Sequence, residues 1–363
     1  MDYFHQILEG AVESKASDIH LKANAPIFFR ISGNMVPLQE EILTQESAKA
    51  IAKFLVPTHM EAQFQKDKEA DFSYYAPEIG RFRVNVFYQR GELSFALRHV
   101  KTNIPTIESV SLPPTLKTLA EANDGIILVC GSTGSGKSTT LAAMLDYVNT
   151  SKRAHIITLE DPIEFVFEDK LSVINQREIG LDTTSFKRAL TYVLRQDPDI
   201  IMIGEMRESE SVTAAVSAAE TGHLVMSTLH SSTASQSISR LLDFFKADER
   251  DYTRSQLATT LRAVICQKLV PAASGEGVYP AVEILVNSPS VRKLLEQNKL
   301  EKLPMAIESG KDEGMQSFNQ SLLGLFERGL ITDEAALEQS PNPDALKMNL
   351  KGIFLNESGG ILG

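Results

Sequence analysis

The spacing of apolar residues changes character near residue 100. Before that point, short amphipathic stretches of helical period alternate with stretches in which every second residue is apolar. The helices predicted there cover 2–14, 47–55 and 59–66, and the strands cover 27–31, 35–38, 81–88 and 93–100. This mixture of hairpins and helices predicts a small α+β domain over residues 1–100.

Residues 101–115 contain three prolines among small polar residues. Proline fixes φ and disfavours helix at the residue before it, so we expect a semi-rigid linker here. From residue 116 to 287, predicted strands alternate with predicted helices, which indicates a parallel sheet in an α/β domain. The strands are 126–130, 155–159, 172–175, 200–203, 224–228 and 281–286, and the helices lie near 138–149, 184–195, 208–220, 233–244 and 249–268.

The chain from 288 to 363 has helical spacing throughout. Predicted helices cover 288–296, 301–309, 316–328 and 332–338. The last dozen residues are rich in glycine, and we expect them to be frayed.

Residues 131–138 read Gly-Ser-Thr-Gly-Ser-Gly-Lys-Ser, which fits the phosphate-binding pattern G-x-x-x-x-G-K-[S/T]. A predicted strand precedes this loop and a predicted helix follows it. Glycines let the backbone curl so that successive N–H groups point at phosphate oxygens, and the helix N-terminus adds partial positive charge. Lys137 would reach the β- and γ-phosphates, and the Ser138 hydroxyl would hold Mg²⁺. The predicted contacts of ATP or ADP are Ser132, Thr133, Gly134, Ser135, Gly136, Lys137, Ser138 and Thr139, together with His223 further along the chain.

Two acidic segments follow predicted strands of the same region. The apolar strand 200–203 leads to Glu205, where an acid could position Mg²⁺. Because Asp is commoner in that position, we expect Glu205 to contact the ion through water. Three carboxylates in 158–164 would repel one another without a cation or a positioned water. There we expect Glu164 to polarise the attacking water and Glu160 and Asp161 to shape the turn. A strand-end cap and a solvated acidic turn are the structural alternatives.

Histidines and arginines supply further candidates. His223 and His230 stand at the two ends of a predicted strand, where they could sense the γ-phosphate or fill a purely structural role. Arg81 and Arg83 lie two residues apart and therefore share one face of a strand, and Arg98 belongs to the next strand. Cations stabilise the charge of phosphoryl transfer, often from a neighbouring subunit. A solvated basic face is the alternative for these arginines.

Composition narrows the class of protein. The chain has 363 residues, 43% hydrophobic and 23% charged, which is ordinary for a globular protein. The net charge of −11 argues against a broad nucleic-acid interface. Cys130 and Cys266 lie in apolar surroundings and are interpreted as buried thiols of a reducing compartment. Without a basic signal-like start or an apolar run of about 20 residues, we expect a cytoplasmic protein that meets a membrane only through partners.

Several of these motifs, in this order, resemble those of one family. Residues 16–21 resemble the opening motif of secretion and pilus ATPases, 131–138 their Walker A motif, and 158–164 their Asp box. Residues 204–207 resemble their Walker B motif and 219–230 their His box. From about residue 3 to 350 the chain resembles the type IV pilus retraction ATPases, the PilT/PilU group of the secretion ATPase superfamily. The resemblance implies a PAS-like N-terminal domain, a RecA-like P-loop ATPase domain and a helical C-terminal extension, assembled as a homo-hexamer.

The resemblance also implies roles for individual residues. Lys137 would be the phosphate lysine, Ser138 the Mg²⁺ ligand, Glu164 the catalytic base and Glu205 the Walker B acid. His223 and His230 would form the His-box pair, and Arg81, Arg83 and Arg98 would reach the nucleotide, some across a subunit boundary. ATP hydrolysis would then power pilus retraction through an inner-membrane platform protein, with the ring at the inner face of the cytoplasmic membrane.

One motif departs from the family pattern. Retraction ATPases usually carry a sequence near AIRNLIRE after the last core strand, whereas residues 290–296 keep its arginine, leucines and glutamate but differ in the middle. Retraction is therefore less firmly implied than ATP hydrolysis. The alternatives are an accessory ATPase that supports a paralogous retraction motor, a more general transport or DNA-translocating NTPase, and a nucleotide-binding scaffold ring.

Overall fold

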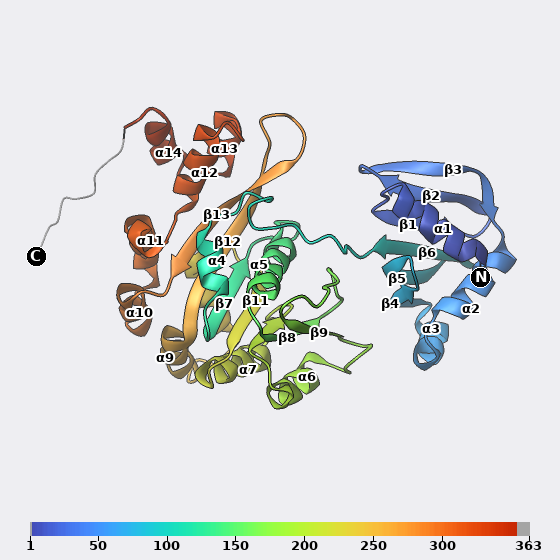
Figure 1. Ribbon diagram of the computed structural model, residues 1–363, viewed down its shortest axis with the longest axis horizontal. Coiled ribbons are helices and arrows are strands. Elements are labelled where there is room, and N and C mark those ends of the chain that lie inside the picture. Colours follow the sequence, from blue (N-terminus) through green and yellow to red (C-terminus); the bar gives the residue numbers. More distant parts are fainter. Residues whose placement is uncertain (1, 354–363) are drawn as a thin grey trace, which may run out of the picture. The chain divides into compact units, whose positions relative to one another are not determined.

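The structure is a computed structural model that describes residues 2–353 and consists of two compact units (Figure 1). Unit 1 contains Met1–Asn103, Asp161–Val166 and Arg177–Thr184, and unit 2 contains Ile104–Glu160, Phe167–Gln176 and Ser185–Gly363. The terminal residues predicted to be frayed lie, from 354 onward, outside the described range. Among the described residues, each helix is too short or too polar to cross a bilayer.

Unit 1 is built on an antiparallel sheet of six strands in the order β3-β2-β1-β6-β5-β4. The strands are β1 (Asp18–Lys22), β2 (Ala25–Ile31), β3 (Asn34–Leu43), β4 (Glu69–Ala76), β5 (Gly80–Gln89) and β6 (Glu92–His99), and the helices are α1 (Asp2–Glu13), α2 (Gln45–Leu55) and α3 (Glu61–Asp67), the last preceded by a 3-10 turn, η1 (Thr58–Met60). Alternation along β5 buries Phe82 and Val84 in the same core as Phe4 and Leu8 of α1. The predicted α+β domain is confirmed, although β1 and β4 were not predicted.

Unit 2 contains a sheet of seven strands in the order β13-β12-β7-β11-β10-β8-β9. The strands are β7 (Gly125–Cys130), β8 (His155–Glu160), β9 (Val173–Glu178), β10 (Ile200–Ile203), β11 (Leu224–Leu229), β12 (Leu261–Pro271) and β13 (Val278–Val286). The strands β12, β7, β11, β10 and β8 pair in parallel, while β13 is antiparallel to β12. The predicted parallel sheet therefore carries an antiparallel strand at one edge.

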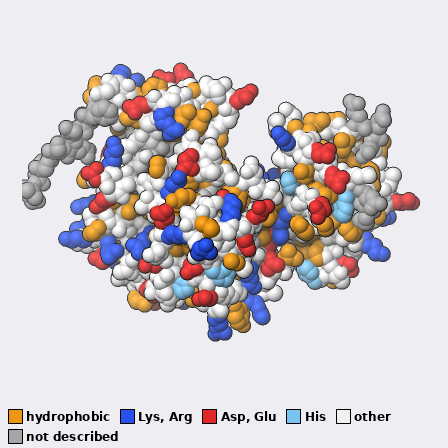
Figure 2. All heavy atoms as spheres, viewed as in Figure 1, with side chains coloured by type: hydrophobic (Ala, Val, Ile, Leu, Met, Phe, Trp, Pro, Cys, Tyr) orange, Lys and Arg blue, Asp and Glu red, His pale blue; other side chains and the backbone are white. Residues whose placement is uncertain are grey.

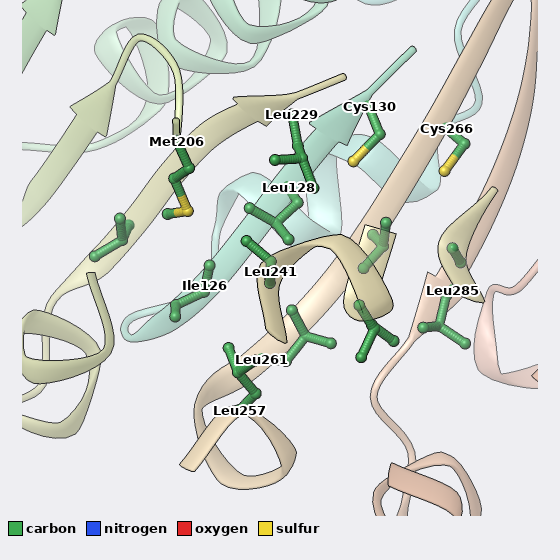
Figure 3. Close-up of a cluster of buried hydrophobic side chains, with 14 of the residues drawn as sticks. Ile126, Leu128, Cys130, Met206, Leu229, Leu241, Leu257, Leu261, Cys266 and Leu285 are labelled. Atoms are coloured by element: carbon green, nitrogen blue, oxygen red, sulfur yellow. The ribbon is translucent and has the colours of Figure 1, made fainter. Parts of the chain in front are cut away.

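Both faces of this sheet are buried. The helices are α4 (Thr115–Ala120), α5 (Lys137–Ser151), α6 (Phe186–Val193), α7 (Ser209–Glu220), α8 (Ala234–Asp243) and α9 (Arg250–Thr260), with a 3-10 turn, η2 (Leu194–Gln196), after α6. Ile126, Leu128 and Cys130 of β7 face one core (Figure 3), whereas Ile127 and Val129 face a second core that includes α4 and α5. Continuous apolar strands are the expected consequence of such two-sided burial.

The prediction of a helix over 249–268 is wrong in its second half. Helix α9 ends at Thr260, and the chain continues as β12 between β7 and β13. Val264 and Cys266 point to one core while Ala263 and Ile265 point to the other. Because both faces are apolar, the segment lacks the alternation that distinguishes a strand from a buried helix.

The proline-rich segment also differs from a free linker. From Ile104 onward the chain belongs to unit 2, and Ile107 and Leu112 are 1% and 5% exposed in the core beside α4. Proline restricts backbone angles but does not prevent the residues between prolines from packing. The segment therefore contributes to the core of unit 2 rather than only connecting the two units.

Helices account for the chain after β13. They are α10 (Pro289–Glu296), α11 (Leu303–Ser309), α12 (Phe318–Glu327), α13 (Asp333–Gln339) and α14 (Pro343–Leu350), with the 3-10 turns η3 (Leu300–Lys302) and η4 (Lys311–Glu313). Ser288 caps α10 by accepting a hydrogen bond from Val291 N, and Pro289 occupies the first helical turn, where its missing N–H is harmless. The helical prediction for this region agrees with these elements, and α14 is an addition to it.

Acidic and basic side chains are intermixed on the face shown in Figure 2. On that face the acidic side chains of the described residues lie among lysines and arginines and do not form one continuous acidic patch (Figure 2). The two cysteines are free, buried and register partners on β7 and β12. Their prediction as buried thiols is confirmed.

Glu283 on β13 carries a pH-dependent prediction. Its side chain is buried, and burial raises the pKa of its carboxyl, although the N–H of Ala234 and the charge of Lys268 act in the opposite direction. A carboxyl whose pKa is raised by folding contributes stability at low pH, and this contribution is lost as the pH rises through the folded-state pKa. Glu283→Gln is therefore expected to gain stability relative to wild type above pH 4.5, the ordinary value for this carboxyl. Urea unfolding from pH 4.5 to 8 checks this, and an unchanged difference across that range would contradict it.

Candidate active site

The glycine-rich loop joins β7 to α5. Gly131, Gly134 and Gly136 have φ values of +154°, +77° and +89°. A Cβ atom at Gly131 would lie 2.3 Å from Ser135 Oγ and 2.6 Å from the backbone oxygen of Gln267. A side chain cannot be accommodated there, so the close curl of this loop requires glycine at that position.

Lys137 lies at the first position of α5. Its side chain is buried, and Nζ donates hydrogen bonds to the backbone oxygens of Gly131 at 3.0 Å and Ser132 at 2.8 Å. The ammonium group therefore lies over the loop and at the helix N-terminus. Ser138 and Thr139 in the same turn are half-buried, while Ser132 and Thr133 are exposed.

Parallel pairing brings several predicted residues to one edge of the sheet. The loop follows β7, Glu160 ends β8, Glu205 follows β10 and His230 follows β11. Gly131 N donates to Leu229 O at 3.2 Å, which joins the start of the loop to the end of β11. The carboxyl ends of strands are where open α/β sheets bind ligands.

Glu205 connects the Walker B-like segment with the His-box-like segment. Its carboxylate accepts hydrogen bonds from Arg207, with Nε at 2.8 Å, and its other oxygen lies 3.3 Å from His230 Nε2. Thr228 Oγ1 donates to Gly204 O at 2.6 Å and links the same two strands. The structure therefore brings the predicted acid and the second histidine into direct contact.

The two glutamates of the Asp-box-like segment have different surroundings. Glu160 is 6% exposed and accepts hydrogen bonds from Thr158 Oγ1 at 2.7 Å and Gln176 Nε2 at 3.2 Å. These bonds fit its expected role of shaping the turn. Glu164 belongs to unit 1 and is exposed to solvent.

The predicted arginines lie on one face of the unit 1 sheet, and each has a carboxylate partner. Arg83 and Arg98 are register partners on β5 and β6, and Arg98 is in turn opposite Asp18. Arg83 donates to both oxygens of Asp71, at 3.2 and 2.6 Å, and this hydrogen bonding raises the pKa of Arg83. Arg98 Nε donates to Asp18 at 2.8 Å.

Arg81 makes the most buried of these ion pairs. Its Nη2 lies 2.9 Å from Glu178 Oε2, and the side chains are 17% and 4% exposed. The same oxygen accepts a hydrogen bond from Ile163 N at 3.0 Å. Arg81 thus supports the backbone of the Asp-box-like segment through Glu178.

Arg81→Met is expected to destabilise the protein by about 3 kcal/mol, because it leaves Glu178 as an unpaired buried charge. Thermal and urea unfolding measure the loss. Adding Glu178→Gln to this variant should recover part of the stability, whereas Arg98→Met, at an exposed pair, should change it by less than about 1 kcal/mol. Equal losses in Arg81→Met and Arg98→Met would contradict this assignment.

His223 lies apart from the other candidates within the chain. It precedes β11, and its backbone oxygen accepts a hydrogen bond from Gly125 N at the start of β7. Its Nδ1 lies 3.0 Å from Ala218 O and 3.1 Å from Thr221 Oγ1. Since a strand of 6 residues spans about 20 Å, His223 is at the edge opposite the loop of its own chain. Within one chain, His223 and the glycine-rich loop therefore lie at opposite ends of the parallel strands, and the contact of His223 with nucleotide stays a prediction.

Sequence reasoning missed five residues beside the loop. The pocket next to Gly131–Ser135 is also lined by Ser232, Leu269, Gln267, Lys268 and Gln339. Gln267 and Lys268 lie in the part of β12 that was predicted as helix, and Gln339 ends α13. For Gln267 and Lys268, the signal in the sequence was that they form a polar pair within an otherwise apolar run.

Comparison with known proteins agrees with this geometry. Residues 1–336 match the family described as Type II/IV secretion system protein. The type IV pilus ATPase PilU of Pseudomonas aeruginosa is 38% identical over 348 residues, covering 96% of this chain and 91% of that protein. The type IV pilus retraction ATPase PilT of the same organism is 40% identical over 339 residues, covering 93% and 98%.

Solved structures give the same relationship. The crystal structure of the pilus retraction motor PilT with bound ADP matches with a TM-score of 0.86 at 42% identity, covering 94% of this chain and 98% of that one. The ATPase DotB of Legionella pneumophila matches with a TM-score of 0.74 at 29% identity, covering 92% and 94%. The predicted fold class is confirmed. The chain belongs to the Type II/IV secretion system protein family and, within it, to the PilT/PilU group of type IV pilus ATPases.

Proposed function

We propose that the protein is a hexameric, ATP-hydrolysing motor that powers the retraction of type IV pili. The observation that carries the proposal is the meeting of the glycine-rich loop, Glu205 and His230 at the carboxyl edge of one sheet. Similarity to PilT and PilU over more than nine-tenths of the chain supports the same function. Rotation of rigid domains against each other would convert hydrolysis into extraction of pilin at an inner-membrane platform protein.

The loop binds the phosphates of ATP through backbone N–H groups of 132–139 and through Lys137. The residues present suit Mg²⁺, which prefers oxygen ligands and keeps several of its waters. Ser138 in the first turn of α5 offers a hydroxyl. Glu205, whose carboxylate is already bound to Arg207 and His230, is suited to a water-mediated contact. Mg²⁺ would supply charge neutralisation at the phosphates.

Glu164 accepts a proton from the attacking water, and its exposed side chain leaves it accessible for that purpose. Arg81, Arg83 and Arg98 stabilise the transferred phosphoryl group from the N-terminal domain of a neighbouring subunit. Their acidic partners are all within unit 1, so a guanidinium that reaches the nucleotide exchanges an intramolecular carboxylate for phosphate. His230 reports the nucleotide state through its contact with Glu205.

The ring would work in the cytoplasm, at the inner face of the cytoplasmic membrane, and would contact the membrane through the platform protein. Nucleic acid is not among the proposed partners. A deletion strain tests the function directly. Loss of twitching in the single deletion, restored by wild type and not by an ATPase-inactive variant, is the expected result.

An accessory role is the second candidate, supported by the altered motif in α10. Arg292, Lys293 and Glu296 of that helix are exposed, while Val291 and Leu295 are buried. Of these exposed residues, Lys293 lies in the part of the motif that departs from the retraction pattern, so the departure can alter a surface contact without altering the core. An accessory ATPase would leave twitching intact in the single deletion and would bind a paralogous retraction motor.

A further inference from the structure

Gln267 of β12 lies directly behind the glycine-rich loop. Its side-chain oxygen accepts a hydrogen bond from Thr140 Oγ1 at 2.6 Å, and its side-chain nitrogen donates to the backbone oxygen of Ser135 at 2.7 Å. Gln267 is 4% exposed and Thr140 2% exposed. One buried amide therefore joins the loop and the first turn of α5 to a neighbouring strand.

The loop is packed against this residue without free space. A Cβ atom at Gly136 would lie 2.7 Å from Gln267 Nε2, and one at Gly131 would lie 2.6 Å from the backbone oxygen of Gln267. Two of the loop glycines are thus required partly by the closeness of β12. A shorter or differently shaped side chain at 267 would remove the side-chain atoms that lie beside Gly136.

The hydrogen bonds have a direct consequence for anion binding. When successive N–H groups of a loop point toward phosphate, the carbonyl groups point elsewhere and need donors of their own. Lys137 supplies donors to the carbonyls of Gly131 and Ser132, and Gln267 supplies one to Ser135. Donors that are fixed before the ligand arrives bind it without the entropy loss of ordering the loop.

We propose that Gln267 is a positioning residue for nucleotide binding, which holds the loop in its phosphate-binding curl through Ser135 and Thr140. The inference rests on the proposed phosphate role of the loop. Gln267 does not contact the reacting atoms in this scheme. Its loss should therefore weaken nucleotide affinity much more than it slows the chemical step.

Three variants of the full-length chain test the inference. Gln267→Met keeps the length of the side chain and removes both hydrogen bonds. Gln267→Glu keeps an acceptor for Thr140 but places a carboxylate against the Ser135 carbonyl. Thr140→Val removes only the hydrogen bond from Thr140 to Gln267 and leaves the bond from Gln267 to Ser135. The matched control is Gln316→Met, because Gln316 is half-buried and its Nε2 donates to Val282 O at 3.1 Å, away from the loop.

Fluorescent ADP titration and steady-state ATP hydrolysis give the readouts, with melting temperature as the measure of folding. Gln267→Met and Gln267→Glu are expected to raise the Kd for ADP and the KM for ATP by about tenfold to thirtyfold, with kcat changed less than about threefold, since each lost bond is worth about 1 kcal/mol, or about fivefold. Thr140→Val should raise the Kd about threefold to fivefold, and adding it to Gln267→Met should cause little further loss. Gln316→Met should leave both constants unchanged.

A merely structural role predicts another pattern, in which the melting temperature and the active fraction fall at unchanged KM. Unchanged Kd and KM in folded Gln267 variants would overturn the inference, as would an equal rise in Gln316→Met. If the Gln267 variants do not fold, Thr140→Val decides by the same criterion. Lys137→Ala distinguishes the phosphate-binding role of the loop from the positioning role of Gln267. If nucleotide binding survives in Lys137→Ala, the role of the loop itself is overturned. If binding is lost in Lys137→Ala but retained in the Gln267 and Thr140 variants, only the role of Gln267 is overturned.

Discussion

Lys137→Ala is expected to abolish detectable nucleotide binding and ATP hydrolysis while the chain keeps its fold. The ammonium group combines full charge, a buried position and the N-terminus of α5, so its bonds to phosphate are charge-assisted in a site of reduced dielectric. Losing such bonds costs about 3 kcal/mol or more, which corresponds to at least ~100-fold in affinity. Fluorescent ADP titration and phosphate release measure the effect.

Circular dichroism and melting temperature show whether the fold is kept. The loop loses two hydrogen bonds from Lys137 to its own carbonyls, so a small decrease in melting temperature is expected. Lys187→Ala is a suitable control, because Lys187 lies in the same unit with a side chain that is 73% exposed. Hydrolysis at the wild-type rate in Lys137→Ala would show that this loop is not the nucleotide site.

Glu164→Gln is expected to lower the rate of hydrolysis by a factor of about 10² to 10⁴ and to leave ATP binding intact. The amide has the size of the carboxylate but cannot accept the proton of water. Single-turnover hydrolysis and ATP binding must be measured on the same preparation. A protein that binds ATP and does not hydrolyse it is the expected result of this change.

The neighbouring acids provide the comparison. Glu168→Gln, at an exposed acid shortly after that segment, should hydrolyse ATP normally. Glu160→Gln should mainly affect stability, because Glu160 is buried between Thr158 and Gln176. If Glu164→Gln hydrolysed ATP normally and Glu160→Gln did not, the catalytic base would have to be reassigned to Glu160.

The elements around the glycine-rich loop could be predicted because local sequence determines them. A short apolar strand, glycines at positive φ and a good helix former in succession have few other solutions. The strand β12 could not be predicted, because its two apolar faces are explained only by neighbours far away in the chain. The prediction of a linker in the proline-rich segment failed for a related reason, because the residues that bury Ile107 and Leu112 come from distant parts of unit 2.

In the candidate site, too, local motifs predicted some features, whereas others depend on residues far apart in the chain. Motifs identified Lys137, Glu205 and His230, and the structure brings the last two into contact. The motif at 16–21 carried no assigned role, yet its Asp18 accepts a hydrogen bond from Arg98 across the β1–β6 pair. Such partnerships depend on strand register, which sequence spacing alone does not fix.

The hairpin of β12 and β13 contacts three parts of unit 2, namely the glycine-rich loop, α13 and the start of α8. Gln267 of β12 donates to the glycine-rich loop at Ser135 O, and the adjacent Lys268 donates to the backbone oxygen of Gln339 at the end of α13. The other strand caps α8 behind His230 by the bond from Ala234 N to Glu283 at 2.8 Å. A displacement of this hairpin would therefore move the glycine-rich loop, the start of α8 and the carboxyl-terminal helices together, so truncations that remove α13 are expected to lower nucleotide affinity.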